Sequence, residues 1–140
     1  MNPIDIVKAT IAAIETHDIE TAAGYTSPDL TVTDPNLPRP VGKDVFFGQM
    51  KVMLAAFPDW HYDVHAITAQ GDQVTVDLTA IATHTAPLQM GAMTLPSTGK
   101  PIIVPDKFIF TVKDDLITAL RVDSPPGGGA PSMMRQLGLG

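Results

Sequence analysis

The stretch VTVDLTAIAT, residues 74–83, decides the class of fold, because apolar and polar side chains alternate along it with one exception at Ile81. This alternation is typical of a β-strand that buries one face and exposes the other. Gly71 and Asp72 mark a turn from an earlier strand over residues 60–69. We therefore predict an antiparallel hairpin in the middle of the chain.

The same kind of pattern predicts the other elements. Residues 102–112 and 116–122 predict a second hairpin. Apolar residues at helical spacing predict helices over residues 3–16 and 44–57, with a shorter one after Asp18. Strands joined by short turns pair antiparallel, and helices that precede them cover one face of the sheet. The predicted class is therefore α+β.

Composition narrows the function. At 140 residues and 44% hydrophobic content, the chain fits one globular domain whose core can hold a pocket. A net charge of −6 argues against nucleic acid or an anionic membrane as a partner. The absence of cysteine excludes disulfides and thiolate catalysis. With no signal-peptide pattern and no apolar run of membrane-spanning length, we expect a cytoplasmic protein with a small apolar partner molecule.

The two ends of the chain differ in character. We expect one domain over residues 1–123. Residues 124–140 form a Pro/Gly-rich linker and a short apolar tail. The sequence leaves open whether this tail is disordered or forms a flap.

Several short motifs in register resemble one family. They are VTDP at 32–35, FPD at 57–59, THT at 83–85, TGK at 98–100 and RQLG at 135–138. In this order they resemble the nuclear transport factor two superfamily, and within it the SnoaL-like polyketide cyclase branch. The resemblance implies a cone-shaped fold in which three N-terminal helices cover a curved, mixed sheet whose strands are mostly antiparallel. It also implies a homodimer. Because this fold hosts isomerases, hydrolases, cyclases and proteins without catalysis, function has to be argued from the site.

Asp34 is the first candidate for a catalytic base. Alternation from Leu30 through Val32 places its carboxyl group on the apolar side of a strand. Burial raises the pKa of a carboxyl group toward the range in which it takes a proton from carbon and returns it. The position also resembles the general base of ketosteroid isomerase. The alternative is that Asp34 opens a turn with Pro35 and bonds nearby backbone.

The chain departs from its relatives at three positions. By resemblance, the oxyanion-hole tyrosine of ketosteroid isomerase falls near Thr10 and its partner acid near Phe108, while the acid of polyketide cyclases falls at Val122. Asp123 lies one place later, on the opposite face of a regular strand unless a bulge turns it back. The alternative for Asp123 is a surface or dimer-interface pair with Arg121.

His84 and Asp106 are further catalytic candidates, because the alternation along each strand places them on the same face as its apolar residues. An imidazole suits proton transfer near neutral pH. The alternatives are a hydrogen-bonded structural histidine and, after Pro105, an aspartate that only shapes a bend.

A pocket would be lined by large apolar side chains, most of which a plain core would also need. The predicted ligand-binding residues are Phe46, Met50, Met53, Phe57, Trp60 and Phe108.

A metal site is not expected. His61, Asp63 and His65 share one face of a strand and could supply three zinc ligands. Their neighbours Trp60 and Tyr62 carry the apolar parity, however, so the trio is expected to face solvent. We predict no metal and no cofactor.

These features together predict an enzyme or a binding protein. The first prediction is acid-base catalysis, an isomerisation, cyclisation or dehydration of a small, largely apolar carbonyl compound, with Asp34 as base and His84 or Asp106 assisting. The alternative is a small-molecule binding module without chemistry, which the departures near Thr10 and Val122 favour. A third interpretation is an interaction subunit that uses an open sheet face.

Overall fold

Side-chain caps begin the first two helices. The computed structural model describes residues 1–139. Helix α1 (Pro3–Glu15) begins where the Asn2 side chain accepts a hydrogen bond from a first-turn backbone N–H, and α2 (Ile19–Gly24) begins where Asp18 does the same. These bonds satisfy N–H groups that have no partner inside the helix. Both helices lie where the sequence predicts them.

The other elements follow in chain order. They are β1 (Thr26–Thr33), β2 (Val41–Gly42), α3 (Lys43–Ala56), β3 (His61–Gln70), β4 (Gln73–Thr83), β5 (Leu88–Met90), β6 (Met93–Leu95), β7 (Pro101–Lys113), β8 (Leu116–Val122) and α4 (Gly129–Gln136).

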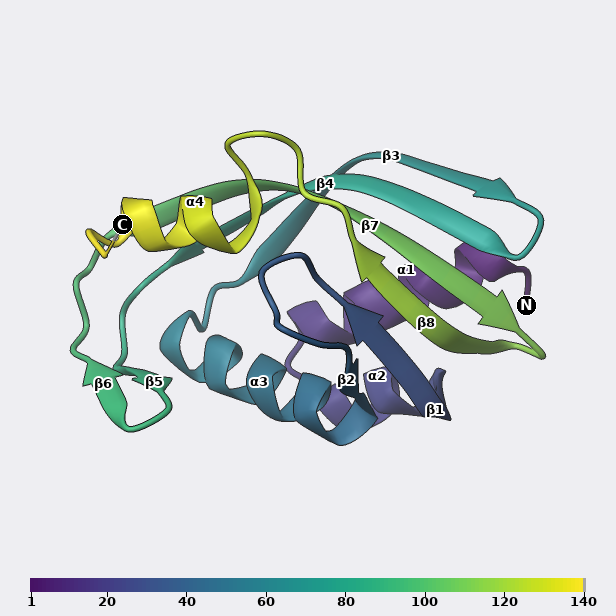
Figure 1. The fold of residues 1–140 in the computed structure, drawn as a ribbon, viewed down its shortest axis with the longest axis horizontal. Helices are drawn as coiled ribbons and strands as arrows, with labels where there is room; N and C mark the ends of the chain where they lie inside the picture. Colours follow the sequence, from purple (N-terminus) through teal and green to yellow (C-terminus); the bar gives the residue numbers. More distant parts are fainter. Residues whose placement is uncertain (140) are drawn as a thin grey trace.

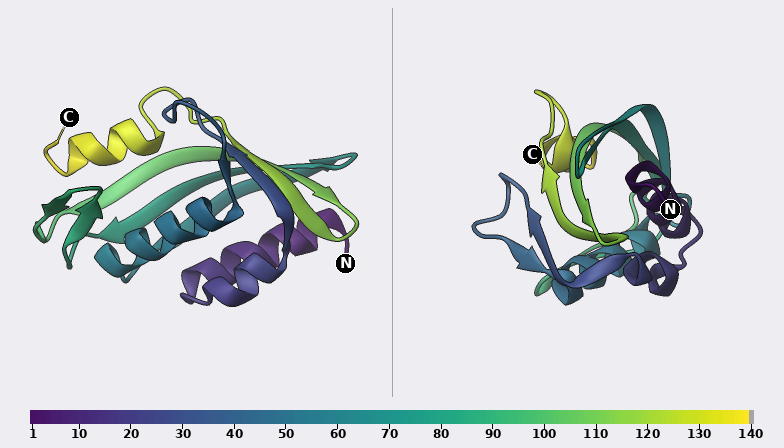
Figure 2. Two further views of the ribbon diagram at one scale, coloured as in Figure 1. Left: turned by 60° about the horizontal axis from the view of Figure 1, so that its bottom comes forward. Right: turned by 90° about the vertical axis from the view of Figure 1, so that its right-hand side faces the viewer.

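Six strands form one curved sheet in the order β2-β1-β8-β7-β4-β3. All neighbours are antiparallel except β1 and β8, which run parallel. Helices α1, α2 and α3 lie on one side of the sheet, beneath its curve (Figures 1 and 2). The prediction of an α+β fold with a mixed, mostly antiparallel sheet and three N-terminal helices is confirmed.

The apolar side of β4 faces these helices. Val74, Val76, Leu78 and Ala82 are at most 2% exposed. On the neighbouring strand β7, Ile102, Val104 and Phe110 in register with this side of β4 are buried likewise, while Asp106 and Phe108 are half-buried. This concave face, with the helices packed against it, forms the core of the protein.

The strand pairing extends beyond the segments predicted. β1 begins at Thr26, although Pro28 lies within it and the pairing with β8 shifts between Thr26 and Thr31. The apolar segment after His84 forms the two-stranded hairpin β5–β6, which lies apart from the main sheet (Figure 1).

The C-terminal segment packs against the edge of β7. Strand β8 ends opposite Phe108, so the first half of β7 has no β8 partner. Helix α4 lies along that half of β7 (Figure 1). Leu137, which follows the helix, is buried. The linker and tail expected over residues 124–140 thus contain a helix that covers a sheet edge.

Within residues 1–139, no helix combines the length and the apolar character needed to cross a membrane.

Candidate functional site

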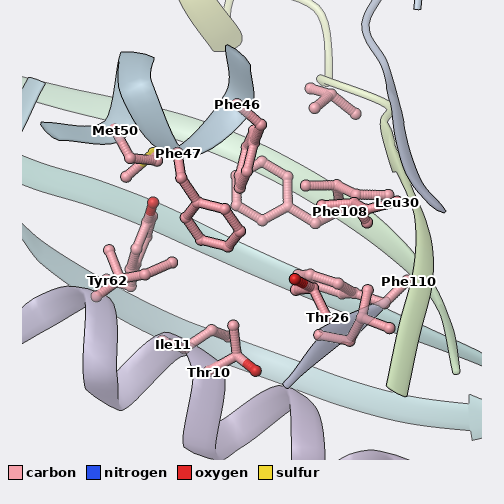
Figure 3. A pocket seen from close by; sticks show the side chains of 14 residues that line it. Thr10, Ile11, Thr26, Leu30, Phe46, Phe47, Met50, Tyr62, Phe108 and Phe110 are labelled. Carbon is pink, nitrogen blue, oxygen red and sulfur yellow. The ribbon is translucent and has the colours of Figure 1, made fainter. Parts of the chain in front are cut away.

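A cavity lies between the concave face of the sheet and helices α1 and α3 (Figure 3). Its volume is about 80 Å³. Its lining consists of Thr10, Ile11, Ile14, Thr26, Leu30, Phe46, Phe47, Met50, Tyr62, Phe108, Phe110, Ile117, Leu120 and Val122. The space is large enough for several water molecules but is smaller than a typical pocket for a drug-sized ligand. A larger guest therefore requires half-buried side chains such as Phe46 and Met50 to move.

Tyr62 carries the uncommitted hydroxyl group of this lining. The Thr10 hydroxyl donates to the Ile6 carbonyl at 2.8 Å, and the Thr26 hydroxyl donates to the Ala23 carbonyl at 2.8 Å. Within residues 1–139, the Tyr62 hydroxyl makes no such hydrogen bond, although the residue is only 7% exposed.

Burial raises the pKa of Tyr62 to about 12; a hydrogen bond from the Trp60 side chain to the phenol oxygen opposes this rise, and the charges of Asp106 and Glu15 add to it. The phenol therefore stays protonated at neutral pH. It is available as a hydrogen-bond donor to an oxygen atom in the cavity.

Asp106 does not line the cavity; it lies on β7, two residues before the lining residue Phe108 and on the same face of the strand. Its Oδ1 accepts hydrogen bonds from the Ser124 hydroxyl at 2.7 Å and from the Lys107 backbone N–H at 2.9 Å. Burial raises the pKa of this carboxyl group, and the charge of Asp34 raises it further, while the two hydrogen bonds lower it. Burial is the largest of these effects. Desolvation of this kind is typical of carboxyl groups that exchange protons with a ligand.

Asp34 follows the end of β1 and is occupied by a local turn. Its carboxylate accepts from the Asn36 backbone N–H at 2.8 Å and from the Asn36 side-chain amide at 3.0 Å. The residue is half-buried and does not line the cavity. The turn that the sequence left as an alternative is therefore present. Asp34 nevertheless lies near enough to Asp106 for its charge to act there.

His84 is 0% exposed and lies in the core, away from the cavity lining. Its Nδ1 lies 2.9 Å from the Thr98 hydroxyl and accepts from the Thr98 backbone N–H at 3.3 Å, and its ring centroid lies 5.2 Å from that of Phe57. Because Nδ1 accepts, the neutral ring carries its proton on Nε2. Within residues 1–139, that atom is buried without a partner. The geometry fits a structural histidine that holds the Thr98 loop.

A family model for the SnoaL-like domain matches residues 7–120, which is most of the chain. This chain belongs to the SnoaL-like domain family. No curated protein sequence matches it significantly.

Solved structures similar to this SnoaL-like domain share its fold. AclR from Streptomyces galilaeus, a candidate hydroxylase, aligns with a TM-score of 0.80 at 20% identity, over 98% of this chain and 82% of its own. IdmH from Streptomyces antibioticus, a candidate polyketide cyclase, aligns with a TM-score of 0.78 at 24% identity, over 99% of each chain. A candidate polyketide cyclase from Acidithiobacillus ferrooxidans aligns with a TM-score of 0.75 at 25% identity, over 96% and 94%.

The SnoaL-like domain brings together only part of the predicted ligand-binding set. Phe46, Met50 and Phe108 line the cavity. Phe57 is fully buried in the core, and Trp60 packs beside it with ring centroids 5.6 Å apart. These two side chains do not line the cavity.

Met53 also lies elsewhere, in a surface depression between α3 and the β5–β6 hairpin. Tyr62, by contrast, was not among the predicted site residues. Its apolar parity beside Trp60 was the available signal, and its hydroxyl group is what distinguishes it from a core residue.

The candidate metal trio on β3 is separated by its hydrogen bonds. His61 Nδ1 lies 3.2 Å from a Glu15 carboxylate oxygen, and His65 Nε2 lies 2.7 Å from the Thr79 hydroxyl. A bulge between Val64 and Ala66 interrupts the pairing there. Within residues 1–139, no three histidine, aspartate or glutamate side chains are grouped so as to hold a metal ion.

At the end of β8, Val122 lines the cavity and Asp123 is exposed. The register between β7 and β8 shifts at Thr111 and Val112, not at this end. No bulge turns Asp123 toward the cavity.

Proposed function

We propose that this protein catalyses proton transfer at carbon in a small, largely apolar carbonyl compound, with Asp106 as the acid-base group and Tyr62 as hydrogen-bond donor to the carbonyl oxygen. One observation carries this: a partly buried carboxyl group of raised pKa lies two residues along β7 from the lining of an apolar cavity, in which the Tyr62 hydroxyl is free to donate a hydrogen bond. Asp106 replaces Asp34 as the proposed base because burial raises the pKa of Asp106 within a strand, whereas Asp34 is held by Asn36 in a turn after β1.

The proposed reaction balances with proton transfers alone and needs no oxidant or reductant. Asp106 Oδ2, which accepts no hydrogen bond within residues 1–139, removes a proton from the carbon next to the carbonyl group. The electron pair moves onto the carbonyl oxygen, where the Tyr62 hydroxyl stabilises the enolate. Protonation at another carbon gives an isomer, and attack on a second carbonyl group gives a ring. In either case Asp106 returns the proton.

The fold family and the names of its structural neighbours support small-molecule chemistry of this kind. The compound and the reaction type are part of the proposal, as is the homodimeric state.

Deuterium exchange into 2-tetralone, an apolar ketone with acidic C1 protons, tests the proposal by NMR in D₂O. The wild-type protein should accelerate the exchange, and Asp106→Asn should lower the rate about 100-fold or more, in line with the usual contribution of a general base. Tyr62→Phe should slow the exchange less. Asp123→Asn, which removes an exposed carboxylate at the end of the next strand, is the matched control. Full exchange activity in Asp106→Asn would reject the proposed base.

The second candidate function is binding without chemistry, which the small apolar cavity and Val122 in its lining favour. In that case, 2-tetralone would shift the NMR signals of Phe108 and Tyr62 while no exchange occurred.

A further inference from the structure

The chain that follows β8 is bonded directly to Asp106. The Asp123 backbone N–H donates to the Lys107 carbonyl at 2.8 Å, which extends the pairing with β7 by one position. The next residue, Ser124, donates its hydroxyl to Asp106 Oδ1 at 2.7 Å. Both polar contacts of Asp106 thus fall on Oδ1, one from its own strand and one from the C-terminal segment.

Two glycines fold this segment back against the same part of β7. A Cβ atom on Gly128 would lie 2.2 Å from the Pro105 carbonyl oxygen, one residue before Asp106. Gly129 has a φ of 68°, and a Cβ atom there would lie 2.4 Å from the Ser124 hydroxyl. Only glycine allows the backbone to come this close without moving the neighbouring atoms. The backbone of residues 128–129 therefore packs against the Ser124 side chain and restricts its position.

Helix α4 anchors the fold-back at its far end. The Gln136 side-chain amide bonds both backbone groups of Ile103, accepting from its N–H at 2.7 Å and donating to its carbonyl at 2.8 Å. It also donates to the Ser132 hydroxyl at 2.9 Å. One glutamine therefore pairs with β7 as a strand would, where β8 has ended and the edge is free.

We infer that the C-terminal segment is a positioning element of the site: Gln136 anchors α4 on the edge of β7, and the fold-back holds Ser124 against Asp106 Oδ1, so that Oδ2 is the oxygen left for proton transfer. This inference rests on the proposed function for its catalytic meaning. The coupling between α4, Ser124 and the Asp106 carboxyl group is measurable without a substrate.

The expected effect has a definite sign. The Ser124 hydrogen bond lowers the pKa of Asp106, against the effects of burial and of Asp34 at the end of β1. Tyr62 on β3 lies near enough to Asp106 for the carboxylate charge to act on it, and the phenol is uncharged. The C-terminal segment contributes Asp123 and Arg135, which are exposed. Removing the Ser124 hydroxyl should therefore raise the Asp106 midpoint.

NMR titration of the Asp106 carboxyl carbon in the full-length protein tests the inference. Ser124→Ala should raise the midpoint by about 1 pH unit, the usual worth of one hydrogen bond to a charged group, and Ser124→Thr, which keeps a hydroxyl, should restore it. Gln136→Ala should shift the midpoint, because releasing the anchor changes both the Ser124 hydrogen bond and the burial of the carboxyl group. Gln89→Ala, which removes a glutamine that bonds Thr94 in the distant β5–β6 hairpin, is the matched control and should change nothing.

An unchanged midpoint in Ser124→Ala would overturn the role of Ser124, and an unchanged midpoint in Gln136→Ala would overturn the role of α4. If Ser124→Ala fails to fold, the pair Ser124→Thr and Gln136→Ala decides the question. These outcomes are separable from the proposed function, because 2-tetralone exchange in Asp106→Asn tests the reaction and the titration tests only the coupling.

Discussion

At the scale of single residues, Asp34 and Asp106 show how the same parity leads to different environments. Both follow apolar neighbours at a spacing of two, so the sequence could place either on the inner face. Asn36, two positions after Asp34, satisfies that carboxylate locally. Asp106 lies within a strand and depends on Ser124, distant in sequence. Local turn chemistry is visible in a sequence, whereas a contact across 18 positions is not.

The raised pKa of Asp106 predicts a pH-dependent effect on stability. A carboxyl group whose folded pKa lies above its unfolded pKa binds its proton more tightly in the folded state. Its favourable contribution is complete below the unfolded pKa and is lost as the pH rises through the folded value. Asp106→Asn should therefore raise Tm relative to wild type more at pH 8 than at pH 4, measured by calorimetry.

The exposed Asp123 provides the control for that experiment. Asp123→Asn should change Tm by the same small amount at both pH values. An Asp106→Asn variant that loses stability with rising pH relative to wild type would show that the carboxylate is stabilised by its surroundings.

At the scale of elements, strands and helices with regular periodicity were predictable and the C-terminal helix was not. The alternation in residues 74–83 gave β4, and the apolar stripe over residues 44–57 gave α3. Residues 124–131 contain proline and glycine, which weaken any local preference for a helix. Helix α4 forms because the free edge of β7 and the Gln136 amide supply tertiary partners. Such partners lie outside any local pattern.

Glycine substitutions separate the connection to α4 from an ordinary helix position. Gly128→Ala places a Cβ atom 2.2 Å from the Pro105 carbonyl oxygen, so the backbone must shift. We expect a loss of about 1–3 kcal/mol in the free energy of unfolding, the usual cost of overpacking. Gly48→Ala in α3 is the matched control, because a Cβ atom added at Gly48 would meet no atom within 4 Å outside its own turn of helix. This variant should gain about 0.5–1 kcal/mol in the free energy of unfolding. Urea unfolding measures both, and equal stability of the two variants would contradict the tight approach at Gly128.

At the scale of the whole molecule, the fold was predictable from the sequence, whereas the residues that line the cavity were predicted only in part. The fold class and the family are confirmed by the sheet, the helices and the match over residues 7–120. Cavity-lining residues such as Phe46 and Phe108 and core residues such as Phe57 are equally apolar. Which of them surround empty space depends on how three helices pack against a curved sheet. That packing is a property of the assembled molecule, and it leaves Tyr62 as the distinctive group in the cavity.

The pH dependence of 2-tetralone exchange tests the central claim most directly. If Asp106 is the proton-transfer group, the rate should rise with pH as the carboxyl group ionises and level off above its midpoint. That midpoint should match the one obtained for Asp106 by NMR in the free protein. A rate that follows hydroxide concentration without an inflection, and that is the same in Asp106→Asn, would contradict the account.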